Sequence, residues 1–219
     1  YLDGSYTCTI LTRDGTLLGV REPRGLKPLN YGKVNGGYAI ASETCALKSV
    51  HARDITSVKP GEVVIVNGDG LRTERFAEAK LSRCSFELIY FLDITSDFDG
   101  ISAWDIRVAG GKQLARKFPV DADVVAPIPE AGRAAAHGFY LESGLPLTEV
   151  LRINREVGRA FILPEKQRVD ALRRKYLPIE SAIEGKRIVL VDDSIVRGDT
   201  TGTIVGIVRE AGAREVHVR

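Results

Sequence analysis

The stretch Arg187-Ile-Val-Leu-Val-Asp-Asp-Ser-Ile-Val-Arg-Gly-Asp-Thr-Thr-Gly202 predicts the architecture of the C-terminal half of this chain. Its apolar, β-branched run at 188–191 is typical of a strand buried on both faces. Two carboxylates, Asp192 and Asp193, follow, and then comes a loop rich in Ser, Thr and Gly. Apolar residues at helical spacing begin at Ile204. A strand, a small-residue loop and a helix in this order predict one unit of a parallel α/β sheet.

The same stretch predicts a binding site for a sugar phosphate. In an open α/β sheet, ligands bind beyond the carboxyl ends of the strands. A loop of Ser, Thr and Gly that enters a helix offers hydroxyls and backbone N–H groups to a phosphate. Asp192 and Asp193 would repel a bare phosphate, but they suit the hydroxyls of an attached ribose or a divalent cation beside it. The plainer alternative is an acidic turn with a helix cap.

The remaining pattern of this half extends the parallel sheet. Apolar runs at 122–129, 146–151, 187–193 and 215–219 alternate with segments of helical spacing. Such alternation predicts βαβ units, in which neighbouring strands run parallel and carry their loops at one edge.

The first stretch resembles the phosphoribosyl diphosphate (PRPP) signature of type I phosphoribosyltransferases. Val191-Asp-Asp-Ser-Ile-Val-Arg-Gly198 and Glu215-Val-His-Val-Arg219 are similar to the glutamine amidophosphoribosyltransferase family, which opens de novo purine synthesis. The family makes 5-phosphoribosylamine, diphosphate and glutamate from PRPP, glutamine and water, and the resemblance implies the same reaction for the complete protein. It implies Mg²⁺ at the two aspartates. The loop residues that it implies in substrate binding are Asp192, Asp193, Ser194, Val196, Arg197, Gly198, Thr200 and Thr201.

A second loop resembles the pyrophosphate-side loop of the same family. Ala122-Asp-Val-Val-Ala-Pro-Ile-Pro129 is strand-like, and Glu130, Ala131 and Gly132 follow it at the start of a helical pattern. The resemblance implies that these three residues bind substrate. Gly132 has no side chain, so the backbone can approach a ligand closely there.

A basic segment at 152–175 resembles the flexible loop of the family through Asn154-Arg-Glu-Val-Gly-Arg-Ala-Phe-Ile162. The resemblance implies that this segment closes over the substrate and excludes water. Arg155 and Lys175 then act in catalysis, and Arg159 binds substrate. The alternative for a charged run of this kind is a solvated face.

Two positions depart from the family pattern. Ala131 stands where the family usually has Ser or Thr, and Ile153 replaces the lysine of the flexible loop. These losses favour a second hypothesis, a catalytically weakened PRPP-binding or regulatory relative. A third hypothesis, transfer to a nucleobase, expects a hydrophobic base-stacking segment, and we see none in the sequence.

The N-terminal part of the chain reads as short β segments. Asp14-Gly15 between two strand-like runs is a strong hairpin signal. Gly4-Ser-Tyr6, Val20-Arg-Glu-Pro-Arg-Gly-Leu-Lys-Pro-Leu29 and Ala41-Ser-Glu-Thr-Cys-Ala-Leu47 are similar to the back half of the family's glutaminase domain. In the family the glutaminase nucleophile is an N-terminal cysteine, and no residue of this chain matches it.

The expected fold class is therefore α/β with two parts. Residues 1–83 are expected to be the C-terminal half of an N-terminal-nucleophile glutaminase layer, which is β-rich α+β. Residues 84–219 are expected to be a type I phosphoribosyltransferase parallel-sheet domain, incomplete at its C-terminus. We interpret the chain as an internal fragment of a longer protein.

The bulk composition excludes several classes of protein. A net charge of +2 argues against a broad nucleic-acid-binding face, and no apolar run is long enough to suggest a membrane span. The three cysteines, Cys8, Cys45 and Cys84, have no paired spacing, so a reducing cytoplasm is expected rather than a disulfide framework. PRPP and glutamine are the expected partners, in a homo-oligomer.

Cys84 is a separate case, because Cys84-Ser-Phe-Glu-Leu-Ile-Tyr-Phe91 resembles a family segment whose cysteine ligates an iron–sulfur cluster in one subgroup. A [4Fe–4S] cluster needs four thiolates. The alternative for Cys84 is a packed free thiol.

Overall fold

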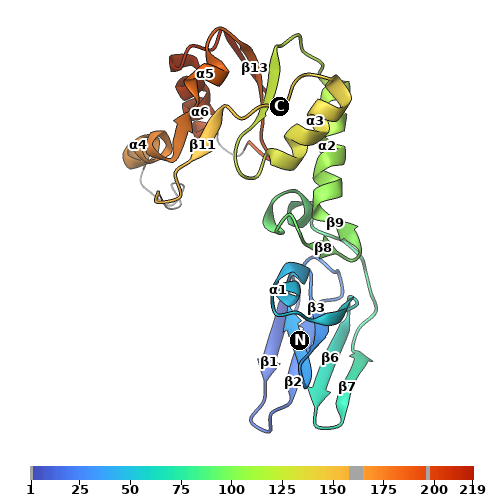
Figure 1. Cartoon of the computed structure of the whole chain (residues 1–219). Helices are drawn as coiled ribbons and strands as arrows, with labels where there is room; N and C mark the ends of the chain where they lie inside the picture. Colours follow the sequence, from blue (N-terminus) through green and yellow to red (C-terminus); the bar gives the residue numbers. More distant parts are fainter. Residues whose placement is uncertain (1, 158–164, 196–197) are drawn as a thin grey trace. The chain divides into compact units, whose positions relative to one another are not determined.

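The computed structural model describes residues 2–157, 165–195 and 198–219, without the side chains of 165–167. The chain divides into two compact units, Tyr1–Ile106 and Arg107–Arg219, which we call the N-terminal and C-terminal units (Figure 1). The expected order of a β-rich part followed by a parallel sheet is confirmed.

The N-terminal unit is built on two antiparallel sheets, ordered β1-β2-β6-β7 and β4-β3-β5. The predicted hairpin at Asp14-Gly15 joins β1 to β2. A core of Leu29, Val58 and Val64 carries partly buried side chains from both sheets. The elements are β1 (Thr7–Leu11), β2 (Leu17–Arg21), β3 (Asn30–Val34), β4 (Gly37–Ala41), α1 (Thr44–Ser49), β5 (Arg53–Ser57), β6 (Glu62–Asn67), β7 (Gly70–Arg75), the π-helical η1 (Glu87–Phe91), β8 (Asp97–Phe98) and β9 (Ile101–Ser102).

A buried arginine and glutamate fix the loop that follows β2. Arg21 donates to Lys27 O at 2.8 Å and pairs with Asp99 at 2.7 Å, although its side chain is fully buried. The Glu22 carboxylate accepts the N–H groups of Arg24 and Leu26. Because a buried charge needs partners, these contacts explain why this loop carries Arg and Glu where a core would carry apolar residues.

The C-terminal unit is built on a parallel sheet, ordered β10-β13-β14, with helices on both faces. A second, smaller sheet of this unit is antiparallel and consists of β11 and β12. The elements are α2 (Ala103–Lys117), which crosses the division between the units, β10 (Val124–Pro127), α3 (Arg133–Ser143), β11 (Leu151–Ile153), α4 (Glu165–Lys175), β12 (Tyr176–Pro178), α5 (Glu180–Ile183), β13 (Arg187–Val191), α6 (Asp199–Glu210) and β14 (Glu215–Val218).

Alternate residues of β13 enter different cores, as a strand buried on both faces requires. Ile188 and Leu190 pack with residues of α4, α5 and α6, whereas Val189 and Val191 pack with residues of α2 and α3. All four are fully buried. The apolar run at 188–191 therefore holds the two helical layers on opposite faces of the sheet.

The predicted strand at 146–151 is only partly correct. Leu147 makes a single parallel bridge to Val125, and Leu151 begins β11, which pairs antiparallel with β12. Two hydrogen bonds make this bridge, from Val125 N–H to Pro146 O and from Thr148 N–H to Val125 O, both at 3.0 Å.

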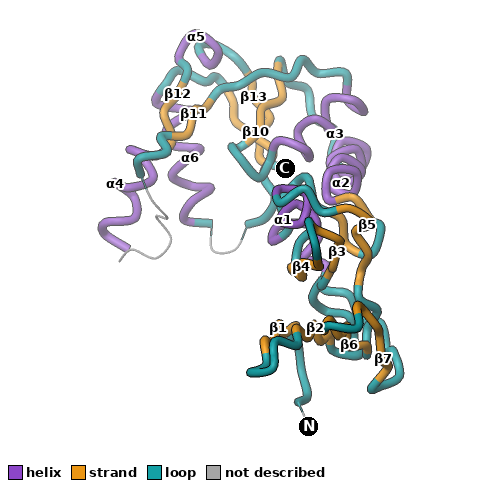
Figure 2. Tube along the Cα trace, turned by 60° about the horizontal axis from the view of Figure 1, so that its bottom comes forward, coloured by secondary structure: helices purple, strands orange, loops and turns teal. Residues whose placement is uncertain are grey.

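Helices α2 and α3 lie side by side at very short range (Figure 2). A Cβ on Gly111 of α2 would lie 1.9 Å from Ala135 O, and one on Gly138 of α3 would lie 2.0 Å from Val108 O. Helix α2 continues through the pair Gly110-Gly111, although glycine is unfavourable in the interior of a helix. The close contact supplies the reason, because only glycine lets the two backbones approach this far.

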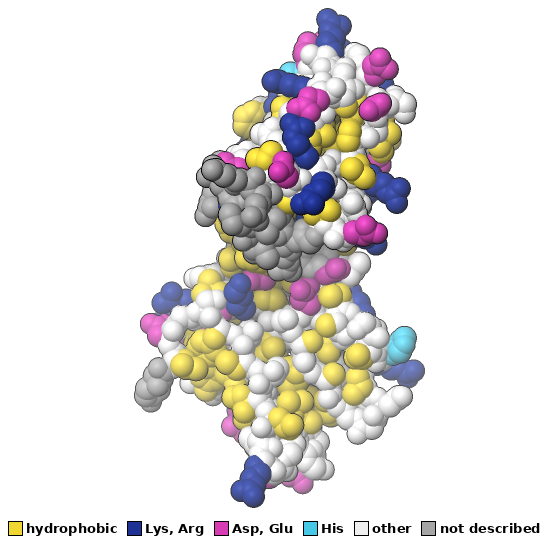
Figure 3. Space-filling model, turned by 90° about the vertical axis from the view of Figure 1, so that its left-hand side faces the viewer, with side chains coloured by type: hydrophobic (Ala, Val, Ile, Leu, Met, Phe, Trp, Pro, Cys, Tyr) yellow, Lys and Arg dark blue, Asp and Glu magenta, His cyan; other side chains and the backbone are white. Residues whose placement is uncertain are grey.

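The surface of the N-terminal unit carries many hydrophobic side chains, which Figure 3 shows on the lower part of one face. Among its exposed large hydrophobic residues are Leu11 at 72% and Phe91 at 55%. Contiguous apolar surface is typical of faces that contact other protein. Within the described part of the chain, every helix is too short or too polar to cross a membrane.

Two helical glycines should respond to alanine in opposite directions. Gly111→Ala should lower the free energy of unfolding by roughly 1–3 kcal/mol, because its Cβ would overlap the α3 backbone. Gly206→Ala in α6 should raise it by up to about 1 kcal/mol, because a Cβ there meets nothing within 4 Å and alanine favours the helix. Urea unfolding followed by circular dichroism measures both, and a stabilised Gly111→Ala would contradict the packing described above.

Candidate functional site

Two loops follow the carboxyl ends of the neighbouring strands β10 and β13, and therefore lie at one edge of the sheet. Pro127 pairs with Val191, and the Ile128 N–H donates to Val191 O at 2.8 Å. Gly132 is buried just before α3, and a Cβ there would lie 2.1 Å from the same Val191 oxygen. The first loop can pass this close to β13 only because the residue is glycine.

The carboxylate pair after β13 is partly buried and incompletely hydrogen-bonded. Asp193 N–H donates to Asp192 Oδ1 at 3.0 Å, and Ser194 Oγ donates to Asp193 Oδ1 at 3.1 Å. Among the described residues, buried Asp193 Oδ2 finds no hydrogen-bond partner. Burial, and then repulsion by Asp193, raise the pKa of Asp192 from 3.8 to about 7. The pair therefore favours a cation or the hydroxyls of a ligand beside it.

The loop after β13 ends at Gly198, whose φ of 82° lies in the left-handed region that favours glycine. Thr200 and Thr201 lie partly buried in the first turn of α6. N–H groups of a first helical turn have no partner within the helix and face the incoming loop. This end of α6 can therefore bind an anion. The predicted residues Val196 and Arg197 fall outside the described residues.

The loop after β10 brings a second set of backbone groups to the same edge. Glu130 is exposed, and its carboxylate pairs with Arg133 Nε at 2.8 Å. Arg133 also pairs with Glu149 at 2.6 Å. Ala131 has no polar side-chain atom, so it contributes only backbone groups beside Gly132. The chain thus brings the predicted residues 130–132 next to the carboxylate loop, as the strand pairing requires.

The predicted catalytic residues Arg155 and Lys175 lie on another part of the C-terminal unit. Arg155 is exposed in the turn after β11, and Lys175 ends α4 with its Nζ 5.8 Å from the ring centre of Tyr176. Their neighbourhood is fixed by the Asn154 N–H, which donates to Lys175 O at 2.8 Å. The structure therefore brings these two residues near one another, at one end of the β11-β12 sheet, which is separate from the sheet of β10 and β13. Arg159 lies outside the described residues.

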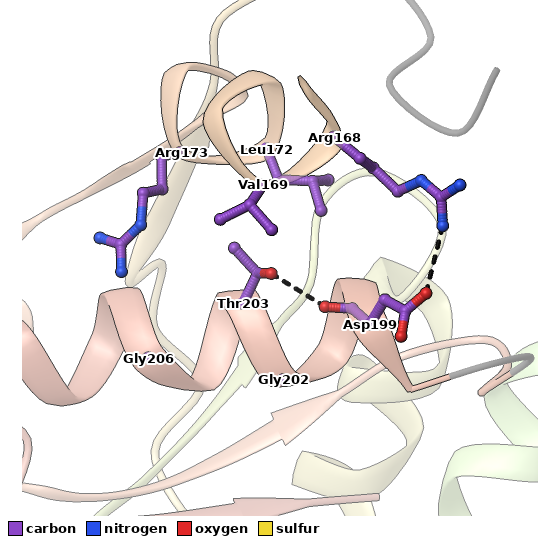
Figure 4. Close-up of a pocket in the computed structure, with 8 residues that line it drawn as sticks. All are labelled: Arg168, Val169, Leu172, Arg173, Asp199, Gly202, Thr203 and Gly206. Carbon is purple, nitrogen blue, oxygen red and sulfur yellow. Dashed lines mark hydrogen bonds and ion pairs between the residues drawn. The ribbon is translucent and has the colours of Figure 1, made fainter. Parts of the chain in front are cut away.

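An ion pair that the sequence analysis missed joins α4 to the start of α6. Arg168 Nη1 lies 3.1 Å from Asp199 Oδ2. The two helices line an open pocket of about 360 Å³ (Figure 4). Its lining consists of Arg168, Val169, Leu172, Arg173, Asp199, Gly202, Thr203 and Gly206. Both charges are visible in the sequence, but no spacing rule pairs residues so far apart.

The two aspartates fit Mg²⁺ better than a metal held by protein alone. Among the residues described, no group of three or more His, Cys, Asp or Glu side chains could hold a metal ion. Mg²⁺ commonly takes one or two carboxylates and completes its shell with water and phosphate oxygens. The unpartnered oxygen of Asp193 suits this arrangement.

Cys84 does not form an iron–sulfur site with the other cysteines of this chain. It is a partly buried free thiol, and the chain has three cysteines, whereas the cluster needs four thiolates. A cluster at Cys84 would require at least one thiolate from outside these residues.

The chain is similar along its whole length to one group of enzymes. The amidophosphoribosyltransferases of Archaeoglobus fulgidus and Bacillus subtilis are 44% and 43% identical to it, each over 100% of the chain. That of Drosophila melanogaster is 40% identical over 98% of the chain. No family model matches the chain.

Solved structures agree with these relatives. A glutamine PRPP amidotransferase from B. subtilis, complexed with ADP and GMP, has a TM-score of 0.89 and 43% identity over 98% of this chain. The chain belongs to the amidophosphoribosyltransferase family. A second structure, described as the allosteric regulatory enzyme of purine biosynthesis, has a TM-score of 0.85 and 43% identity over 93% of the chain.

The chain spans about half the length of the relatives that it matches, 48% of the A. fulgidus amidophosphoribosyltransferase and 46% of that of B. subtilis. The family assignment therefore concerns the part of those relatives that this chain matches.

Asp192 should titrate near neutral pH in the metal-free protein, where carbon NMR of the side-chain carboxyl can follow it. Because burial and repulsion raise its folded pKa above the unfolded value of 3.8 to about 7, the folded state binds this proton more tightly. The contribution of Asp192 to stability therefore falls as pH rises from about 4 to about 7. Asp193→Asn should lower the pKa of Asp192, since it removes the repelling charge. An Asp192 carboxyl that titrates near 4 in the unsubstituted protein would contradict this.

Proposed function

We propose that the complete protein is an active amidophosphoribosyltransferase, a glycosyltransferase that converts PRPP, glutamine and water into 5-phosphoribosylamine, diphosphate and glutamate. One observation carries the proposal. Asp192 and Asp193 follow the carboxyl end of β13, in the loop that leads to the first turn of α6, and a second loop lies at the same sheet edge. A ribose that carries a phosphate at one end and diphosphate at the other matches this arrangement in charge and in order. Family membership supports the choice of reaction.

In this proposal each loop binds a different part of the substrate. Asp192 and Asp193 hold the ribose hydroxyls, directly or through Mg²⁺. The 5′-phosphate binds at Ser194 to Thr201, where the hydroxyls of Thr200 and Thr201 and the N–H groups of α6 face it. Glu130, Ala131 and Gly132 border the diphosphate with backbone groups.

Displacement of diphosphate from the ribose needs positioning and charge more than covalent help. Positive charge develops at the sugar and negative charge on the leaving group, so fixed cations near the diphosphate stabilise the transition state. Mg²⁺, when bound, neutralises part of the diphosphate charge. Arg155, Arg159 and Lys175 are proposed to cover the diphosphate and exclude water, which would otherwise hydrolyse the sugar.

The remaining expectations belong to the complete protein. Residues 1–83 are proposed to be part of the glutaminase domain that supplies ammonia, and residues 84–219 part of the phosphoribosyltransferase domain. The glutaminase nucleophile is proposed to lie outside this chain. We also propose a cytoplasmic homo-oligomer, and an iron–sulfur ligand role for Cys84 stays a prediction.

The alternative, a weakened PRPP-binding relative, depends on Ala131 and Ile153. Ile153 is a residue of β11 that packs against the core beneath α4 and α6, opposite Tyr176. An apolar residue is thus accounted for by packing there, so its presence is weak evidence for lost catalysis. The discriminating measurement is turnover.

Asp192→Asn and Asp193→Asn should each weaken PRPP binding by roughly 1–3 kcal/mol, the cost of an unmatched polar partner. The full-length enzyme with Mg²⁺ is the right material, with affinity from titration calorimetry and diphosphate release measured with ammonia as nucleophile. Ammonia bypasses the glutaminase, and a nucleobase offered instead tests the nucleobase hypothesis directly.

Asp121→Asn is a matched control, because this exposed carboxylate pairs with Arg187 at the amino end of β13 rather than at the loop end. It should leave PRPP affinity unchanged. Binding of PRPP without ammonia-dependent turnover would support the weakened relative. Equal affinities for the unsubstituted enzyme and both site variants would refute the proposed binding mode.

A further inference from the structure

Two ion pairs join α4 to α6, one near each end of α6. Arg168 Nη1 lies 3.1 Å from Asp199 Oδ2 at the first residue of α6. Arg173 binds Glu210, the last residue of α6, with both guanidinium nitrogens at 2.6 and 2.7 Å. Val169 and Leu172 of α4 and Thr203 of α6 lie between the two pairs and line the open pocket of about 360 Å³ (Figure 4). Both pairs join an arginine of α4 to a carboxylate of α6, at opposite ends of α6.

Asp199 stands at an unfavourable place for a phosphate-binding loop. It directly follows Gly198 and opens α6, whose first-turn N–H groups are the proposed donors to the 5′-phosphate. A carboxylate there suits the helix itself, since negative charge is stabilised at a helix N-terminus. It nevertheless competes with a phosphate for the same positive field and repels it.

Arg168 supplies the compensating charge from a different element. Its side chain is 17% exposed, whereas that of Asp199 is 50% exposed. A shielded cation beside a half-exposed anion keeps its influence because solvent screens it less. Leu172, one turn further along α4, is buried in the core of the unit and holds the helix in place.

We propose that Arg168 is a positioning residue for the 5′-phosphate of PRPP. It neutralises Asp199 and so allows a dianion to bind at the start of α6. The inference rests on the proposed function, because it assumes that this loop binds a phosphate. It goes beyond that function by giving the basic segment a charge-compensating role at the phosphate end of the substrate, apart from its role at the diphosphate.

The competing explanation is that Arg168–Asp199 only fastens two helices together. Arg173→Ala is the matched control, since it removes an ion pair between the same helices at the far end of α6. If both ion pairs only stabilise the packing of α4 on α6, Arg168→Ala and Arg173→Ala both lower stability, and neither changes PRPP affinity more than the other. If the charge at the phosphate end matters, only Arg168→Ala weakens PRPP.

The test is PRPP affinity of the full-length enzyme with Mg²⁺, by titration calorimetry, together with the thermal midpoint of each variant. Arg168→Ala should weaken PRPP roughly fivefold, as expected for one partly screened charge near a ligand anion. Arg168→Lys should stay within about twofold of the unsubstituted enzyme, because it keeps the charge. Arg173→Ala should also keep PRPP affinity within about twofold of the unsubstituted enzyme, and it should lower the thermal midpoint.

The double variant separates charge compensation from direct contact. Asp199→Asn alone should bind PRPP as tightly as the unsubstituted enzyme or more tightly. Adding Arg168→Ala to it should change affinity less than twofold, because no carboxylate is left to neutralise. A fivefold loss that persists in the Asp199→Asn background overturns the proposal, as does equal behaviour of Arg168→Ala and Arg173→Ala. An unsubstituted enzyme that does not bind PRPP overturns the proposed function itself.

Discussion

The parallel pairing of β10 with β13 is the constraint on which the candidate site depends. Four residue pairs, from Val124–Ile188 to Pro127–Val191, align the strands so that both loops leave at the same edge. The hydrogen bond from Ile128 N–H to Val191 O carries that alignment into the first loop. Gly132 then passes the end of β13 at a distance that excludes any Cβ. Both loops therefore lie at one edge of the sheet, as the proposed sharing of one substrate between them requires.

The carboxylates of Asp192 and Asp193 are incompletely hydrogen-bonded at that edge. The buried position raises the pKa of Asp192 to about 7, and its neighbour's charge adds to the effect. A fold selected only for stability would pair such groups, because an uncompensated buried charge is costly. The unpartnered oxygen of Asp193 therefore argues for a ligand or cation that supplies what the protein does not. A raised pKa of this kind is typical of functional sites.

Sequence patterns predicted the elements that depend on local chemistry. The apolar run before Asp192, the helix that follows Gly198 and the hairpin at Asp14-Gly15 all fold as their residues indicate. The sequence-based predictions were incomplete where contacts between distant segments determine which residue stands at a position. The helix can carry glycine at position 111 because the α3 backbone passes too close for a Cβ, and the pairing of Arg168 with Asp199 joins residues with no pattern in common. Asp192 and Asp193 could be found from the sequence, whereas the pairing of Arg168 with Asp199 could not.

Ile153 shows how a departure from a family pattern can have a structural origin. A lysine at this position would replace a side chain that packs on the core, beside β12. The ammonium group would have to leave that core to reach solvent, because a buried charge without a partner is costly. Isoleucine instead secures β11, from which the turn that carries Arg155 begins. Of the two departures, Ala131 is therefore the one that bears on the proposed diphosphate-binding loop.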